Sequence, residues 1–229
     1  MTSLPEGFRA LVIGSSGGIG SAVSEALRQD GRCAEIATLS RSEDGLDITD
    51  EASVRDAAAQ LEGEFHLIFC ATGALTIDGV GPEKALKQLH PDAMMKQFAL
   101  NALGPALILK HFATKMVKRE RGLIAFLSAR VGSIGDNHLG GWISYRASKA
   151  ALNQIIRTAS IEFARTHSQS VLAALHPGTV ATSLSEDYSS GRERFRPEES
   201  AAKMLAVLDG LQPEQSGNFF AYDGSSIEW

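Results

Sequence analysis

The stretch FRALVIGSSGGIG, Phe8 to Gly20, joins an apolar run to a glycine-rich turn and decides the fold. The run predicts a buried strand, and Ser21 to Gln29 after the turn has helical periodicity. Glycines allow a tight turn and close approach of the backbone to an anion, which the free N–H groups of a helix start attract. The turn therefore predicts a pyrophosphate cradle for a dinucleotide, with candidate contacts at Gly14, Ser15, Ser16, Gly18, Ile19 and Gly20. Its spacing departs from G-x-G-x-x-G by one residue, so a plain connecting turn is the alternative.

The same order of strand and helix recurs along the chain. Further buried strands are expected in CAEIATLS, FHLIFCA, GLIAFLS and SVLAALH, and further helices over Asp50 to Leu61, Pro91 to Val117, Trp142 to Thr166 and Pro197 to Leu211. Local signals favour Asp50 as a cap, Gly31 as a helix end, Pro197 in a first helical turn, and the basic cluster KRER at 118–121 as the close of a long helix. Successive βαβ units predict an α/β fold: a single doubly wound parallel sheet in a Rossmann-type three-layer αβα sandwich.

Composition limits the class of protein. With 229 residues and 44% hydrophobic content, residues 1–229 are expected to form one domain. The net charge of -5 offers no basic face, so nucleic acid is not an expected partner. No apolar run is long enough to span a bilayer, and Cys33 and Cys70 show no metal spacing and no disulfide framework. We expect a cytoplasmic protein that binds neither membrane nor metal.

The end of the second expected strand indicates which dinucleotide is bound. Ser40 and Arg41 stand where an acidic residue would hold an adenosine ribose 2′-hydroxyl. A guanidinium without a nearby carboxylate favours a 2′-phosphate, so NADP(H) is expected over NAD(H); a solvated arginine at a strand end is the alternative. Asp47, next to the apolar Ile48, is a candidate acceptor for the adenine amino group, or equally a turn or cap residue.

The segment YRASK places Tyr145 and Lys149 four residues apart inside an expected helix. Side chains at this spacing share one helix face, and an ammonium near a phenol favours the phenolate and lowers the phenol's pKa. Tyr145 could then donate a proton to a carbonyl oxygen as hydride reaches the carbon, or accept one from an alcohol. Alone, such a pair is common on helix surfaces; together with the glycine turn it indicates catalysis.

Four motifs in order, GSSGGIG, NALG (Asn101 to Gly104), YRASK and HPGTVAT (His176 to Thr182), resemble the short-chain dehydrogenase/reductase family over nearly the whole chain. The segment at 127–153 and the ending GNFFAYDGSSIEW look closest to its C-factor and sniffer-type carbonyl reductase branch. The resemblance implies that Tyr145 is the proton donor, that Lys149 also binds the nicotinamide ribose, and that Asn101 holds a water in a proton relay. It further implies cofactor contacts at Ala71, Thr72, Gly73, Pro177, Gly178, Thr179 and Val180.

Two positions depart from the family pattern. Where the family has Asn-Asn-Ala-Gly, this chain has Cys70 to Gly73, which keeps the glycine and loses both asparagines. The family's catalytic serine aligns with Ala129. Ser128 or Ser133 could polarise the substrate oxygen instead, and Ser128 reaches the site only if its strand has ended or bulged there. Without either serine, loss of one donor would cost roughly 10²-fold or more in rate.

These features predict an NADPH-dependent reductase of aldehydes or ketones, with Tyr145 as acid and Lys149 as its tuner. Ala129 motivates an alternative, a dinucleotide-binding regulatory or signalling protein with weak or no turnover. A methyltransferase on a similar sheet explains neither Arg41 nor YRASK. The expected ligands are a small carbonyl or alcohol substrate and a second copy of the chain, and Asp136, Asn137, His138, Trp142 and the segment 181–196 are expected to border the pocket.

Overall fold

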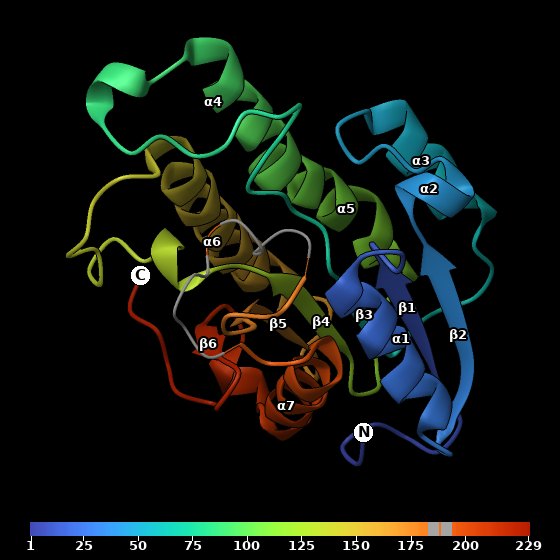
Figure 1. The fold of residues 1–229 in the computed structure, drawn as a ribbon. Helices are drawn as coiled ribbons and strands as arrows, with labels where there is room; N and C mark the ends of the chain where they lie inside the picture. Colours follow the sequence, from blue (N-terminus) through green and yellow to red (C-terminus); the bar gives the residue numbers. More distant parts are fainter. Residues whose placement is uncertain (183–187, 189–193) are drawn as a thin grey trace.

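The computed structural model describes residues 1–182, 188 and 194–229, and its backbone forms one sheet with helices on both faces (Figure 1). All strands are parallel, in the order β2-β1-β3-β4-β5-β6. Their bounds are β1 Phe8–Ile13, β2 Cys33–Leu39, β3 Leu67–Cys70, β4 Leu123–Leu127, β5 Val171–His176 and β6 Phe219–Ala221. The predicted doubly wound parallel sheet is confirmed. The strand that was not predicted, β6, has only three residues, too few to show a pattern.

The helices divide between the two faces (Figure 1). One face packs against α1 (Gly18–Gln29) and α7 (Pro197–Gly210), and the other against α3 (Glu51–Gln60), α5 (Gly104–Phe112) and α6 (Ile143–Phe163). A further helix, α4 (Pro91–Phe98), packs on α6, and the short α2 (Arg41–Asp44) follows β2. Alternation sorts the core: Leu11 and Ile13 face the α3/α5/α6 side, whereas Ala10 and Val12 face α1 and α7.

The long helix predicted over Pro91 to Val117 was wrong in two respects. It is interrupted by a π-helical turn, Ala99–Leu103, and ends at Phe112 in α5, with a 3₁₀ turn after it. The basic cluster at 118–121 therefore lies in a connection to β4 and closes no helix. Gly31 follows Asp30, the C-cap of α1, so this helix ends directly before Gly31, as predicted. Asp50 and Pro197 act as predicted: the Asp50 carboxylate accepts from Ala52 N, and Pro197 opens α7.

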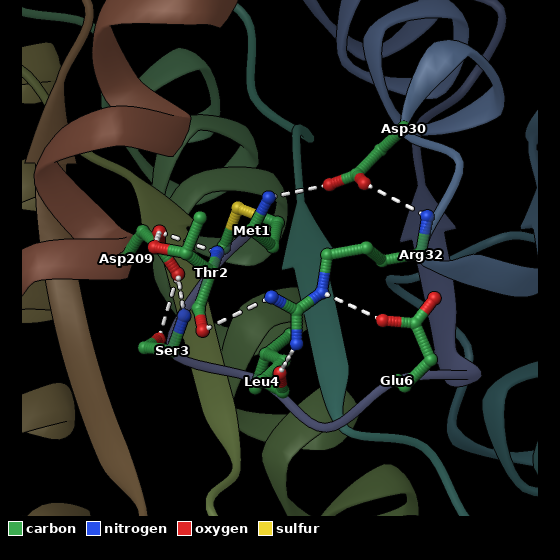
Figure 2. A network of polar contacts seen from close by, with 8 residues as sticks. All are labelled: Met1, Thr2, Ser3, Leu4, Glu6, Asp30, Arg32 and Asp209. Atoms are coloured by element: carbon green, nitrogen blue, oxygen red, sulfur yellow. Dashed lines mark hydrogen bonds and ion pairs between the residues drawn. The ribbon is translucent and has the colours of Figure 1, made fainter.

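A network of polar contacts lies at the amino ends of the strands (Figure 2). Asp209, at the end of α7, accepts hydrogen bonds from the backbone and hydroxyl groups of Thr2 and Ser3 at 2.6–2.9 Å. Arg32 donates to the Leu4 carbonyl at 2.7 Å, and the Met1 amino group pairs with Asp30. These bonds hold the first residues of the chain against α7 and the loop before β2.

Candidate active site

A cavity of about 460 Å³ opens at the carboxyl ends of β1, β3, β4 and β5. Its walls come from the loops that follow these strands, at 17–19, 71–73, 127–131 and 176–180, and from Tyr145 and Lys149 of α6. In a parallel sheet with helices on both faces, ligands bind at this edge where the strand order reverses. Here β1 has β2 on one side and β3 on the other, so the glycine turn after β1 lies at that reversal.

The glycine turn has the geometry of an anion cradle. Gly14 has φ +85° and lies against the Ala71 backbone, and a Cβ on Gly20 would meet the Gly14 carbonyl at 2.1 Å. The N-terminus of α1 follows with Gly17 as its N-cap and no side chain capping it. Ser15 is buried, and its hydroxyl has no hydrogen-bond partner in the described part of the chain. These residues fit the pyrophosphate of a dinucleotide.

The charged side chains that follow β2 differ from the prediction. Arg41 is exposed at the start of α2, as a 2′-phosphate contact would require. However, Asp44 reaches back one helical turn, and its carboxylate accepts from Ser40 N at 2.7 Å. The premise that no carboxylate lies here was therefore wrong. Asp47 forms a turn, because its carboxylate accepts from the Thr49 N–H and hydroxyl at 2.8 and 2.7 Å, and these bonds lower its pKa.

Ile48 is buried, and its side chain occupies the space in which a Cβ on Gly104 of α5 would lie. It therefore packs between the loop after β2 and α5. After β3, Gly73 has φ +142°, and a Cβ there would lie 3.0 Å from both Asn101 Oδ1 and Lys149 Nζ. Glycine at this position lets the loop at 71–73 pass directly over these two polar groups.

Tyr145 and Lys149 lie on one face of α6 and are almost fully buried, at 7% and 3% exposure. Lys149 Nζ donates to the Leu127 carbonyl at 3.0 Å and lies 5.9 Å from the centre of the Tyr145 ring. Burial raises the pKa of Tyr145 and lowers the pKa of Lys149 to about 8. The expectation that the ammonium alone makes the phenol more acidic was therefore wrong for the protein by itself, since desolvation penalises both charged forms.

Asn101 sits in the π-helical turn between α4 and α5, and is fully buried. Its Oδ1 accepts from Ala74 N at 3.0 Å, and its Nδ2 donates to Ala74 O at 2.9 Å and to Gln97 Oε1 at 2.6 Å. The turn therefore brings the side-chain amide beside the loop after β3 and close to Lys149. π-helical turns are frequent at functional sites.

The serines are less favourably placed. β4 ends at Leu127, directly before Ser128, and Ser128 lines the cavity. However, the Ser128 hydroxyl donates to Asn153 Oδ1 at 2.6 Å. The hydroxyl of Ser133 accepts from Asp136 N at 3.1 Å, and Ser133 is not among the residues that line the cavity. Ala129 contributes a methyl group to the wall.

The last residue of β5, His176, and the loop after it, 177–180, also line the cavity. Gly178 has φ +79°, and a Cβ there would meet Phe195 and Tyr222 at 2.8–3.0 Å. Ser200 of α7 donates to the Pro177 carbonyl at 2.7 Å and fixes the turn. His176 accepts from Arg130 N at 3.3 Å, and burial lowers its pKa to about 4. A neutral imidazole therefore borders the cavity.

Part of the predicted border of the pocket is confirmed at the outer rim of the cavity. Asp136 and Trp142 line the cavity, whereas Asn137 and His138 do not. Thr182 and Tyr188, from the predicted segment 181–196, also line it. Sequence reasoning missed Arg146 of α6 and the loop residues Arg130 and Leu139, whose side chains no periodicity places. Of the segment 181–196, residues 183–187 and 189–193 lie outside the described residues. Within the described part, no helix is both long and apolar enough to cross a bilayer.

Comparison with known proteins identifies a matching family and several relatives. The family model of the short chain dehydrogenases matches residues 45–193. A 1-hydroxy-2-glutathionyl-2-methyl-3-butene dehydrogenase from Rhodococcus sp. (strain AD45) is 32% identical over 96% of this chain and 98% of its own. The C-signal protein of Myxococcus xanthus is 36% identical over 59% of this chain and 78% of its own.

Solved structures share the fold. A short-chain dehydrogenase/reductase from Burkholderia multivorans with bound NADP is 26% identical, with a TM-score of 0.78 over 96% of this chain and 99% of its own. The Sniffer carbonyl reductase of D. melanogaster has a TM-score of 0.82 at 18% identity, over 97% and 99% of the two chains. The matches to the C-signal protein and to Sniffer agree with the predicted resemblance, the first in sequence and the second in fold. The chain belongs to the short-chain dehydrogenase/reductase family of oxidoreductases.

Proposed function

We propose that this chain is an NADP(H)-dependent carbonyl reductase that converts an aldehyde or ketone to an alcohol. One observation carries the proposal: Tyr145 and Lys149 lie buried side by side on α6, facing the cavity that the glycine turn borders. A phenol that faces a ligand cavity beside a buried ammonium is equipped to exchange a proton with a bound carbonyl oxygen.

The residues of the cavity would hold the cofactor along its length. The glycine turn from Gly14 to Gly20 would bind the pyrophosphate, with the Ser15 hydroxyl as a free donor. Arg41 would bind the 2′-phosphate, with Asp44 moving off Ser40. The loops at 71–73 and 177–180 would contact the two riboses and the nicotinamide. The NADP bound in the Burkholderia relative supports this choice of cofactor. When bound, NADPH supplies the hydride.

Tyr145 would donate the proton to the substrate oxygen. In reduction the phenol starts protonated, and its burial in this protein favours that state. Lys149 would stabilise the phenolate that remains and bind the nicotinamide ribose, from the position that its bond to Leu127 O fixes. Asn101, beside Lys149, would hold a relay water for reprotonation. Ser128 would act on the substrate only after releasing Asn153.

A second candidate, a dinucleotide-binding regulatory protein with weak turnover, is favoured by a specific observation. Ala129 replaces a hydroxyl, and the neighbouring Ser128 hydroxyl is already bonded. The similarity to the C-signal protein of Myxococcus xanthus, whose name denotes a signal, supports the same candidate. Tight NADPH binding without turnover on a broad panel would favour it.

The test follows nicotinamide absorbance with NADPH or NADH and a panel of aldehydes and ketones. The reverse reaction should include alcohols and hydroxyl-bearing glutathione conjugates, because the name of the Rhodococcus relative describes such a molecule. We expect turnover with NADPH, and at least about 100-fold less in Tyr145→Phe with unchanged cofactor binding. A silent panel, or equal activity in Tyr145→Phe, contradicts the proposal.

We also propose that the protein works in the cytoplasm as a homo-oligomer. Light scattering of the purified chain would give its mass in solution, against 24.4 kDa for one copy.

A further inference from the structure

The first turn of α6, which carries Tyr145, is held by a residue from a different loop. Trp142, the N-cap, has the left-handed conformation (φ +53°), and no side chain of its own caps the helix. Glu83, from the loop between β3 and α4, supplies the missing cap: its carboxylate accepts from Ser144 N at 3.2 Å and from the Ser144 hydroxyl. The Glu83 carbonyl also accepts from Trp142 N at 2.5 Å.

The Glu83 carboxylate is buried, at 8% exposure, and no cation lies within ion-pair distance of it in the described part of the chain. Its charge is balanced by the N–H and O–H of Ser144 and by the positive end of the α6 dipole. Removing one partner of such a buried contact is costly, so the contact fixes the backbone immediately before Tyr145.

Glu83 and Tyr145 border the same hollow. A second cavity of about 360 Å³, on the side of Tyr145 that faces the loop at 77–83 and α4, is lined by both residues and by Ser144. Its other ionisable lining residues are His90, Asp92 and Lys96, all exposed. Tyr145 also lines the active-site cavity, whose other ionisable residues are Arg130, Asp136, Arg146, Lys149, His176 and Tyr188. Within these linings Glu83 is the one buried carboxylate.

We infer that Glu83 is a positioning residue that fixes Tyr145 toward the substrate and keeps its phenol protonated during carbonyl reduction. This inference rests on the proposed function. A negative charge that lines the same cavity as the phenol disfavours the phenolate, and it acts against the cation of Lys149, whose Nζ lies 5.9 Å from the centre of the Tyr145 ring. Carbonyl reduction needs a proton on the phenol, so a buried carboxylate at this point favours that direction of the reaction.

The decisive variant is Glu83→Gln, which keeps an oxygen acceptor for Ser144 and removes the charge. We expect the alkaline limb of the pH profile for NADPH-dependent reduction to move down by about 0.5 pH unit or more. Glu83→Ala also loses the anchor, so its kcat should fall about 10-fold or more while NADPH binding changes by less than about 2-fold. Ser144→Ala, which keeps the backbone contact and the charge, should lower kcat without moving the limb.

A second readout identifies the titrating group, because Lys149 could also shape the limb. With [13Cζ]tyrosine and saturating NADP⁺, NMR would follow the phenol, assigned by its loss in Tyr145→Phe. The Tyr145 signal should titrate about 0.5 pH unit or more lower in Glu83→Gln than in wild type. The control is Asp92→Asn, an exposed carboxylate on the same cavity, which solvent screens and which should shift the signal by less than about 0.2 unit.

The inference is overturned if the folded Glu83→Gln protein leaves both the limb and the Tyr145 signal unmoved, or if the phenol stays protonated to high pH in both proteins. Should Glu83→Ala fail to fold, the Glu83→Gln result alone decides. Failure of the proposed function looks different: the wild type then shows no turnover at any pH, while the NMR titration still reports whether the charge of Glu83 acts on Tyr145.

Discussion

The two ends of the sheet use similar polar side chains in opposite ways. At the amino ends, Asp209 and Arg32 form hydrogen bonds with backbone groups of the first residues of the chain (Figure 2). The partners of these bonds all lie within the protein. At the carboxyl ends, Lys149 is fixed by a contact to the Leu127 carbonyl, and Lys149 and Tyr145 still border a cavity.

This difference separates the polar groups that stabilise the fold from those that serve binding or catalysis. A polar group whose bonds are all made within the protein contributes to folding, whereas a buried group that faces a cavity lowers stability and is retained for a ligand. Changes to the cavity-facing groups at the carboxyl ends should therefore alter catalysis or binding more than folding. Changes at the amino ends should do the reverse, and each prediction below tests one side.

The largest effect is expected at Lys149, where Lys149→Met removes the charge and keeps the shape. We expect kcat/KM for NADPH-dependent reduction to fall about 10³-fold, because both the tuning of Tyr145 and a ribose contact are lost. Unfolding by urea should stay close to wild type or shift to higher denaturant, since a buried ammonium is costly. Lys110→Met, an exposed lysine paired with Glu51, is the control. A large loss of stability with normal catalysis would contradict the prediction, because Lys149 would then stabilise the fold as the groups at the amino ends do.

Arg41 tests the outer part of the same end. Arg41→Ala should weaken NADPH binding by about 10- to 100-fold, measured by calorimetry, because a charge-assisted contact to the 2′-phosphate is lost. NADH binding should change by less than about 2-fold, since NADH carries no 2′-phosphate. The control is Arg55→Ala, an exposed arginine paired with Asp56. Equal losses for both cofactors would assign Arg41 a general role and leave the preference for NADP(H) unexplained.

The sequence could predict what short-range patterns determine. The glycine turn, the apolar strands and the pair on α6 each depend on residues within a few positions of one another, and the sheet and the placement of Tyr145 and Lys149 follow from them. Asp44 reaching Ser40 and Glu83 reaching Ser144 were not predicted. The first depends on a helix of only four residues, too short to show a pattern in the sequence, and the second on a contact between residues 61 positions apart.

Ser128 tests whether the cavity wall takes part in the reaction. Its hydroxyl is committed to Asn153, so Ser128→Ala should destabilise the protein by about 1–2 kcal/mol and lower kcat by less than about 10-fold. Urea unfolding and steady-state kinetics on the same samples separate the two. The control is Ser160→Ala, a buried serine on α6, whose hydroxyl donates to Arg157 O. A fall in kcat of about 100-fold or more would make Ser128 the oxyanion donor and place it with the cavity-facing groups.

Asp209 tests the amino ends, where the smallest change in kinetics is expected. Burial opposes its charge, but hydrogen bonds from Ser3 and Thr2 prevail and hold its pKa at about 2, against 3.8 for an ordinary aspartate. A pKa lowered in the folded state stabilises the protein above the unfolded pKa, and that contribution is lost as the pH falls through the folded pKa. Because the residue is half-buried and solvent screens part of the effect, Asp209→Asn should cost about 1 kcal/mol at pH 7 and about half of that at pH 3.

Urea unfolding at the two pH values measures this cost, and kcat and KM should match wild type because the network involves residues that precede β1 and β2, whereas the cavity lies at the carboxyl ends of the strands. Asp56→Asn, exposed on α3, should change neither quantity. If Asp209→Asn lowered kcat at unchanged stability, the amino-end network would be coupled to the site through α7, whose Ser200 binds the Pro177 carbonyl. The two ends of the sheet would then act as one unit, because α7 would transmit the position of the first residues to the cavity wall.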